Sequence, residues 1–211
     1  MRNLFTSLAL IISAVTFAQG GKIMNTLSKA EWGVRANYLV NTNSLGKQNK
    51  LFMGDLDSHG FNVGISAKAD LGKKLFINPE LYYNNSITHQ IEMPILLGYS
   101  ILPNKFAIIA GPSIKYAISS DTKDNLTGFA QQTNIPGVKY NGISSMFKAG
   151  FQAGFQTYFK NGKYVLSAKY DGAITGQTVN LENISTGKRY EMKEKDNFIS
   201  IGLGYNFGKS K

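Results

Sequence analysis

Hydrophobic and polar residues alternate along eight segments of the chain, which indicates β-strands with two different faces. The alternation is clearest in residues 61–71, where apolar residues occupy every odd position and Asn, Gly, Ser, Lys and Asp occupy the even ones. Each of the other segments follows the same rule. The eight predicted strands are residues 32–40, 61–71, 75–83, 89–99, 106–116, 147–159, 164–170 and 197–207.

The last of these segments indicates which face points outward. Its large face carries Ile199, Ile201, Leu203, Tyr205 and Phe207, whereas the opposite face carries only Ser, Gly and Asn. Residues that small cannot cover a hydrophobic core. We therefore expect the large face to point to lipid and the small face to line the interior of a barrel.

Charged residues are confined to one face in all eight segments. The apolar faces carry none, as expected where a charge in the middle of the bilayer costs ~2–4 kcal/mol. An eight-stranded barrel has an interior that its own side chains just fill, so the charges of the opposite faces should neutralise one another there. These predicted lumenal charges are Arg35, Lys68, Asp70, Glu80, Glu92, Lys115, Lys148 and Lys169.

Connection lengths and aromatic positions agree with a membrane barrel. Every second connection is short, which is typical of barrels with short periplasmic turns and longer extracellular loops. Aromatic residues lie on the apolar faces near the strand ends, where they would form girdles at the two membrane interfaces. Those at the short-turn end are Trp32, Tyr99, Phe106, Phe159, Tyr164, Tyr205 and Phe207, and those at the loop end are Phe61, Tyr83, Tyr116 and Phe147.

The beginning of the chain has the features of a secretory signal peptide. Arg2 precedes an apolar run over residues 8–17 that is too short to span a bilayer, and Ala18 marks a cleavage site. We expect a signal peptide over residues 1–18 and one barrel domain over residues 19–211. A buried N-terminal helix is the alternative. The predicted fold class is all-β, an eight-stranded antiparallel up-and-down transmembrane β-barrel.

Composition narrows the chemistry and the partners. The chain has no Cys, which excludes thiol nucleophiles and Cys-based metal sites, and only 17% of its residues are charged. Its net charge of +10 could suggest nucleic acid, but export and the lack of basic runs with interleaved aromatics argue against that partner. We expect no cofactor. The expected partners are outer-membrane lipids, the outer-membrane insertion machinery, and a protein on the extracellular or periplasmic side.

Four short sequences resemble the PorT-like outer-membrane β-barrel family of Bacteroidetes-type bacteria. They are residues 77–83 (INPELYY), 91–99 (IEMPILLGY), 110–113 (AGPS) and 202–207 (GLGYNF). The resemblance implies an eight-stranded outer-membrane barrel, in a family with one branch that assists type IX secretion. Pro79, Pro94 and Pro112 lie within predicted strands, and local bulges would accommodate them.

Two functional alternatives remain beside a non-enzymatic barrel that acts in surface anchoring, binding or envelope assembly. One is a lipid A-modifying acyl hydrolase, because His59 and His89 lie at the loop-end rim close to Ser58 and Ser86. A rim histidine is more often simply solvated, so we assign no catalytic residue. The other alternative is a secreted soluble barrel of lipocalin type, which would carry its apolar faces inside.

Overall fold

A computed structural model describes residues 29–42, 59–86, 88–120, 138–143, 146–183, 186–187, 189–195 and 197–209. The predicted signal peptide, residues 1–18, lies outside the described residues, and so does Ser58.

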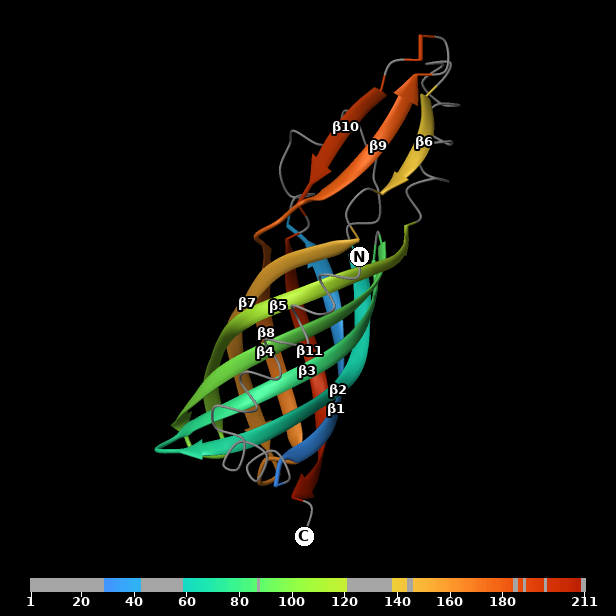
Figure 1. Cartoon of the computed structure of the whole chain (residues 1–211). Helices are drawn as coiled ribbons and strands as arrows, with labels where there is room; N and C mark the ends of the chain where they lie inside the picture. Colours follow the sequence, from blue (N-terminus) through green and yellow to red (C-terminus); the bar gives the residue numbers. More distant parts are fainter. Residues whose placement is uncertain are drawn as a thin grey trace.

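Eight of the described strands close into an antiparallel barrel (Figure 1), which confirms the predicted fold class. Each strand pairs with the next along the chain, and the first strand pairs with the last to close the wall. Closure leaves no unpaired strand edge in the barrel. The strands are β1 (Glu31–Asn41), β2 (His59–Gly72), β3 (Leu75–Asn85), β4 (Thr88–Leu102), β5 (Phe106–Ser120), β7 (Phe147–Phe159), β8 (Tyr164–Ala173) and β11 (Phe198–Lys209).

Three of the four short connections lie together at one end of the barrel and are built on left-handed backbone conformations. The fourth, residues 86–87 between β3 and β4, lies at the loop end, so the prediction of a longer connection there is wrong. Gly72 has φ +87° between β2 and β3, and Gly162 has φ +90° between β7 and β8. Asn104, in the turn between β4 and β5, has φ 54°. Glycine and asparagine adopt this region at low cost. Lys73, Lys74 and Lys160 in the same turns also have positive φ, between 47° and 68°, so the turns are only partly built from residues that favour this conformation.

The strand prolines do not sit at register shifts, so the expected bulges are absent there. Between β3 and β4, Pro79 pairs with Ile95 and Tyr82 pairs with Glu92 in the same register. Regular pairing is merely interrupted between these two points, beside Pro94. The shifts occur elsewhere, for example between His89 and Gln90 in β4. A proline removes one ladder hydrogen bond, and the neighbouring pairs hold the register across the gap.

A second, smaller sheet extends the molecule beyond the loop end of the barrel (Figure 1). It contains β6 (Val138–Ile143), β9 (Gln177–Asn183) and β10 (Arg189–Glu194) in the order β10-β9-β6. The alternation predicts long loops over residues 117–146 and 171–197, where these three strands lie. These strands have only six or seven residues with two or three apolar positions each, which is too few for a reliable alternation.

Two positions predicted to face lipid are buried instead. Ala67 and Ala69 of β2 are 7% and 1% exposed, and they pack with Ala30 and Ile77. The alternation therefore predicts correctly that both alanines lie on the outer side of the wall, but their side chains are not exposed there.

Candidate functional site

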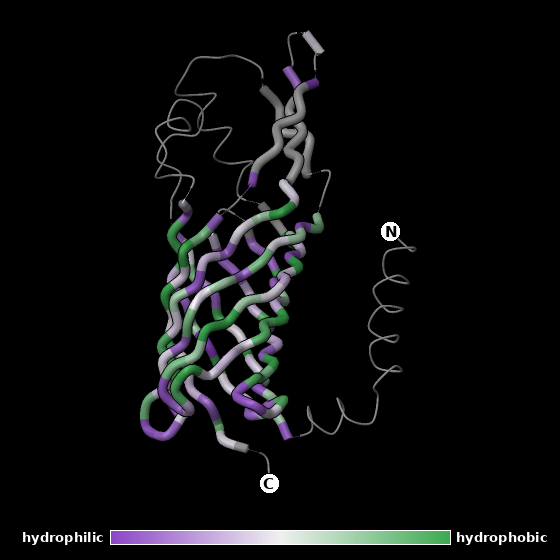
Figure 2. Tube along the Cα trace, turned by 90° about the vertical axis from the view of Figure 1, so that its left-hand side faces the viewer, coloured by the Kyte–Doolittle hydropathy of each residue, from purple (hydrophilic) through white to green (hydrophobic). Residues whose placement is uncertain are grey.

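The barrel wall has opposite polarity on its two surfaces. On β11, Ile201 and Leu203 are 57% and 69% exposed, whereas Ser200 and Asn206 are 3% and 1% exposed. Hydrophobic and polar positions alternate in the same way along the other barrel strands (Figure 2). A soluble barrel would bury its large apolar face, while hydrocarbon stabilises a wall with that face outside. The protein is a transmembrane β-barrel.

The aromatic residues predicted as girdles lie on the exterior. Near the short turns, the rings of Tyr164 and Tyr205 meet edge to face with centroids 5.5 Å apart. At the loop end, the rings of Tyr116 and Phe147 lie 4.9 Å apart. Trp32, Phe61, Tyr83, Tyr99, Phe159 and Phe207 are exposed, and Phe106 is half-buried.

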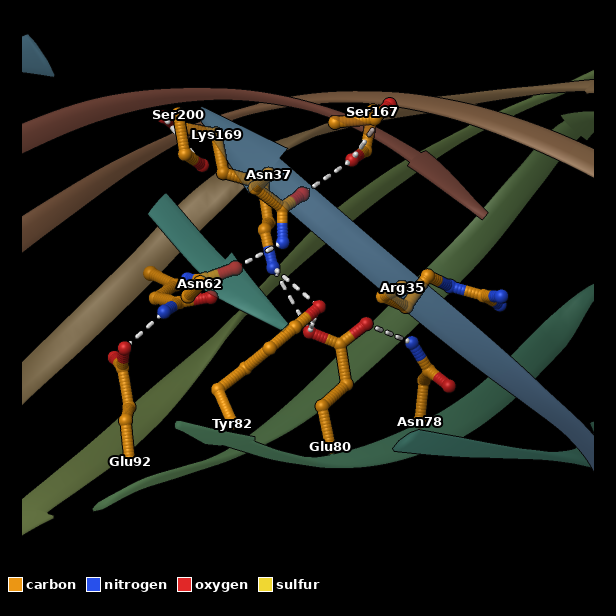
Figure 3. Close-up of polar contacts among 12 residues, drawn as sticks. Arg35, Asn37, Asn62, Asn78, Glu80, Tyr82, Glu92, Ser167, Lys169 and Ser200 are labelled. Carbon is orange, nitrogen blue, oxygen red and sulfur yellow. Dashed lines mark hydrogen bonds and ion pairs between the residues drawn. The ribbon is translucent and has the colours of Figure 1, made fainter. Parts of the chain in front are cut away.

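An ion pair crosses the lumen between Glu80 of β3 and Lys169 of β8 (Figure 3). The Lys169 Nζ lies 2.8 Å from Glu80 Oε2, which also accepts a hydrogen bond of 2.9 Å from the Tyr82 hydroxyl. Asn78 Nδ2 donates to the other carboxylate oxygen at 2.8 Å. The carboxylate is thus bonded through both oxygens, as a buried charge requires. Because β3 and β8 are not neighbours in the wall, these bonds connect opposite sides of the barrel.

A second buried group surrounds Glu92 of β4. Gln152 Nε2 and Asn84 Nδ2 each donate to a different Glu92 oxygen at 2.7 Å. Lys115 Nζ lies 3.8 Å from Glu92 Oε1 and forms a closer ion pair with Asp171 of β8. Two acids and one lysine therefore meet here, and amide groups satisfy the remaining oxygens of Glu92.

Arg35 connects the first strand to the last. Its Nη2 donates to Asn206 Oδ1 at 2.6 Å, and Asn206 Nδ2 donates to the Gly162 carbonyl oxygen at 2.8 Å. The polar face of β11 thus contributes a hydrogen-bonded residue next to a short turn. Lys148 of β7 is also buried, at 3% exposure. Of the predicted lumenal charges, all but Lys68 and Asp70 are buried.

The glycine-rich face of β11 makes room for a neighbouring side chain. A Cβ atom placed on Gly202 would lie 1.7 Å from Asn37 Oδ1, so any larger residue there would displace Asn37. Asn37 donates to Asn62 Oδ1, and its own oxygen accepts a bond of 3.3 Å from Ser167 (Figure 3). The small residues of this strand therefore reflect a filled lumen.

An apolar cluster that the alternation does not predict fills another part of the lumen. Phe76 and Tyr158 come from different strands and point inward together, and Lys68 Nζ lies 4.7 Å and 4.6 Å from their ring centroids. These inward residues sit on the face that carries the charges, so the alternation alone hides them. The cluster comprises Phe76, Leu96, Ala107, Ile109, Tyr158 and Val165.

A pocket of about 500 Å³ opens at the short-turn end. Lys68 and Asp70 line it together with Glu31 and Tyr158. Lys68 is half-buried and Asp70 is exposed, which places these two predicted lumenal charges at the mouth of the barrel. Because Tyr158 also belongs to the apolar cluster, the cluster lies next to this mouth.

Both rim histidines contact outward-facing tyrosines. His59 stacks on Tyr38 with ring centroids 5.5 Å apart, and Tyr83 Oη lies 2.7 Å from His89 Nδ1. A Ser–His–acid site needs its histidine within hydrogen-bond reach of the serine. Tyr83 therefore engages one ring nitrogen of His89, and Ser58, the serine next to His59, lies outside the described residues.

Among the residues that the structure describes, no group of three or more His, Asp or Glu side chains is arranged to hold a metal ion. No helix among the same residues is long and apolar enough to cross a membrane.

The sequence matches no protein-family model and no curated protein sequence. Among solved structures, the chain is similar to the N-terminal barrel domain of Pseudomonas aeruginosa OprF, at 14% identity and TM-score 0.44 over 85% of this chain and 100% of that one. It is also similar to P. aeruginosa OprG, at 12% identity and TM-score 0.49 over 85% of this chain and 97% of that one. A third similar structure is a major outer membrane protein of Thermus thermophilus, at 14% identity and TM-score 0.44 over 84% of this chain and 99% of that one. The fold assignment itself rests on the closed strand order.

Proposed function

We propose that the protein is a non-enzymatic integral protein of the bacterial outer membrane, with a barrel that anchors a small sheet at the loop end. In this proposal the barrel acts in surface anchoring, binding or envelope assembly. The observation that carries it is the filled lumen, crossed by buried ion pairs and closed in part by an apolar cluster.

A filled lumen argues against solute transport. The Glu80–Lys169 pair and the bond from Gln152 to Glu92 join strands that are separated in the wall, so a solute would have to break several buried polar contacts. Separating a buried ion pair costs several kcal/mol, because it leaves each charge without a partner in a dry interior. The barrel is therefore better suited to holding a structure in the membrane than to conducting.

The sheet of β6, β9 and β10 supplies the surface for binding. It stands outside the barrel wall at the loop end, where connecting segments of barrels usually carry their function. The resemblance to PorT-like barrels supports a role in the cell envelope, and a protein partner on this sheet is the form of binding we propose.

Two measurements on the full mature chain test the proposal. Unboiled and boiled samples of the membrane fraction should migrate differently on a denaturing gel, because a closed barrel resists detergent until heated. The folded protein in a planar lipid bilayer should show no conductance steps. Recovery from the supernatant without detergent, a band that does not shift, or regular conductance steps would each contradict the proposal.

The non-enzymatic part has its own test. Reconstituted protein incubated with lipid A should release no fatty acid. If it does, and if His59→Ala or His89→Ala abolishes the release, the hydrolase alternative is correct.

A further inference from the structure

The lipid-facing surface has a hollow centred on Ala36 of β1. Ala36 pairs with Leu203 on one side and with Val63 on the other, so two larger side chains flank its methyl group. Along β1, its outward neighbours are Val34 and Tyr38, which are 42% and 52% exposed. Ala36 thus has bulky residues on all four sides.

Two apolar pockets meet over this hollow. Both are shallow and open, and one extends toward Val34 and Tyr205 while the other extends toward Tyr38 and Phe61. Both are lined by Ala36, together with Val63 and Leu203. They form a trough along β1, which leads from the short-turn girdle toward the loop-end girdle.

The trough has a polar group at its loop end. Tyr38 lines the second pocket, and its ring stacks on the exposed His59 at 5.5 Å with an angle of 18° between the rings. An imidazole N–H and a phenol O–H are both donors, and they lie where aromatic residues meet the headgroups of a bilayer. An apolar trough that ends in two donors at the membrane boundary has the polarity of a phospholipid.

We propose that this trough is a binding site for one lipid of the loop-end leaflet, with an acyl chain on Ala36 and a phosphate group against His59 and Tyr38. A second copy of the chain fits less well. Leu203 and Ile201 protrude at 69% and 57% exposure, so another barrel would rest on these ridges and leave the space over Ala36 empty. A flexible acyl chain can enter between the ridges and fill it.

Filling the trough tests the acyl-chain contact. The full mature protein is folded into phosphatidylcholine vesicles that contain phosphatidic acid with a photoreactive diazirine in its acyl chain, and crosslinked peptides are identified by mass spectrometry. In the wild type, crosslinks should concentrate on β1, β2 and β11. Ala36→Leu should lower them about tenfold there, since its side chain takes the place of several methylene groups. Ala110→Leu, at another exposed alanine on β5, is the matched control and should leave the pattern unchanged.

Removing the donor tests the headgroup contact. His59→Ala should reduce trough crosslinking by the phosphatidic acid probe but not by a diacylglycerol probe that lacks phosphate. The control is His89→Ala, which removes the other rim histidine. It should leave trough crosslinking by both probes unchanged.

Three results would overturn the site. Crosslinks spread evenly around the barrel would mean an ordinary lipid annulus only. Equal labelling of Ala36→Leu and Ala110→Leu would remove the acyl-chain contact. Crosslinked dimers joined through β1, β2 and β11 would show that a second copy occupies the trough.

Discussion

The ammonium group of Lys169 lies 2.8 Å from the carboxylate of Glu80, although the two residues belong to β8 and β3 on opposite sides of the lumen. The pair is buried from water, and Tyr82 and Asn78 satisfy the carboxylate further. A polar interior of this kind fixes the barrel shape because each charge needs its partner across the lumen.

Removing one partner of this pair should be costly. We expect Lys169→Met to lower the free energy of unfolding by about 3–5 kcal/mol, since it leaves Glu80 charged in a dry interior. Adding Glu80→Gln should recover most of that loss, because both charges are then gone. The measurement is urea unfolding in lipid vesicles, followed by Trp32 fluorescence.

The control for this cycle is Lys163→Met, in the exposed turn between β7 and β8, which should change stability little. If the double variant is as unstable as Lys169→Met alone, the two residues do not form a mutually dependent pair.

The apolar cluster predicts that the effects of substitutions at Gly98 and Phe76 on stability are coupled. A Cβ atom on Gly98 would lie 2.0 Å from Phe76 Cζ, so Gly98→Ala forces the ring to move. We expect Gly98→Ala to cost about 1–3 kcal/mol in the wild type. Phe76→Ala should cost about 3–5 kcal/mol alone, because it leaves a cavity.

Together, these two changes should cost less than the sum of the single losses, because the ring that clashes is absent. The same unfolding measurement checks this. Strict additivity would show that Gly98 does not make room for Phe76.

The alternation of residue types predicts the wall of the barrel well, for a physical reason. A strand in a membrane barrel has one face in hydrocarbon, so its pattern has period two over its whole length. The predicted segment 147–159 has the same bounds as β7. Other strands extend further at the loop end, as β5 does to Ser120, and the alternation there continues at least to Ile118.

The sequence predicts which residues face the lumen but not which of them contact one another there. Which charge meets which depends on strand tilt and register, and these bring Glu80 to Lys169 rather than to Arg35 or Lys115, which the sequence equally allows. Phe76 and Leu96 are hidden for a different reason. They face inward among polar residues, and only the closed geometry shows that they meet.

The exterior predicts that a charge is tolerated at one exposed apolar position and not at another. Leu203 and Ile174 are 69% and 57% exposed, but Leu203 lies midway along β11, whereas Ile174 follows the loop end of β8. We expect Leu203→Arg to lower the unfolding free energy by ~2–4 kcal/mol in vesicles and Ile174→Arg to lower it by ~0–1 kcal/mol. Similar small losses for both would mean that the exterior of β11 does not face hydrocarbon.

Orientation in the membrane can be read with single cysteines, because the chain has none of its own. Thr186 is exposed between β9 and β10, and Lys163 is exposed in the short turn before β8. If the loops face outward, a membrane-impermeant maleimide should label Thr186→Cys in whole cells. Lys163→Cys should be labelled only after the outer membrane is permeabilised, and labelling of both after permeabilisation is the control for reactivity. The reverse pattern in whole cells would place the short turns outside and the sheet of β6, β9 and β10 in the periplasm.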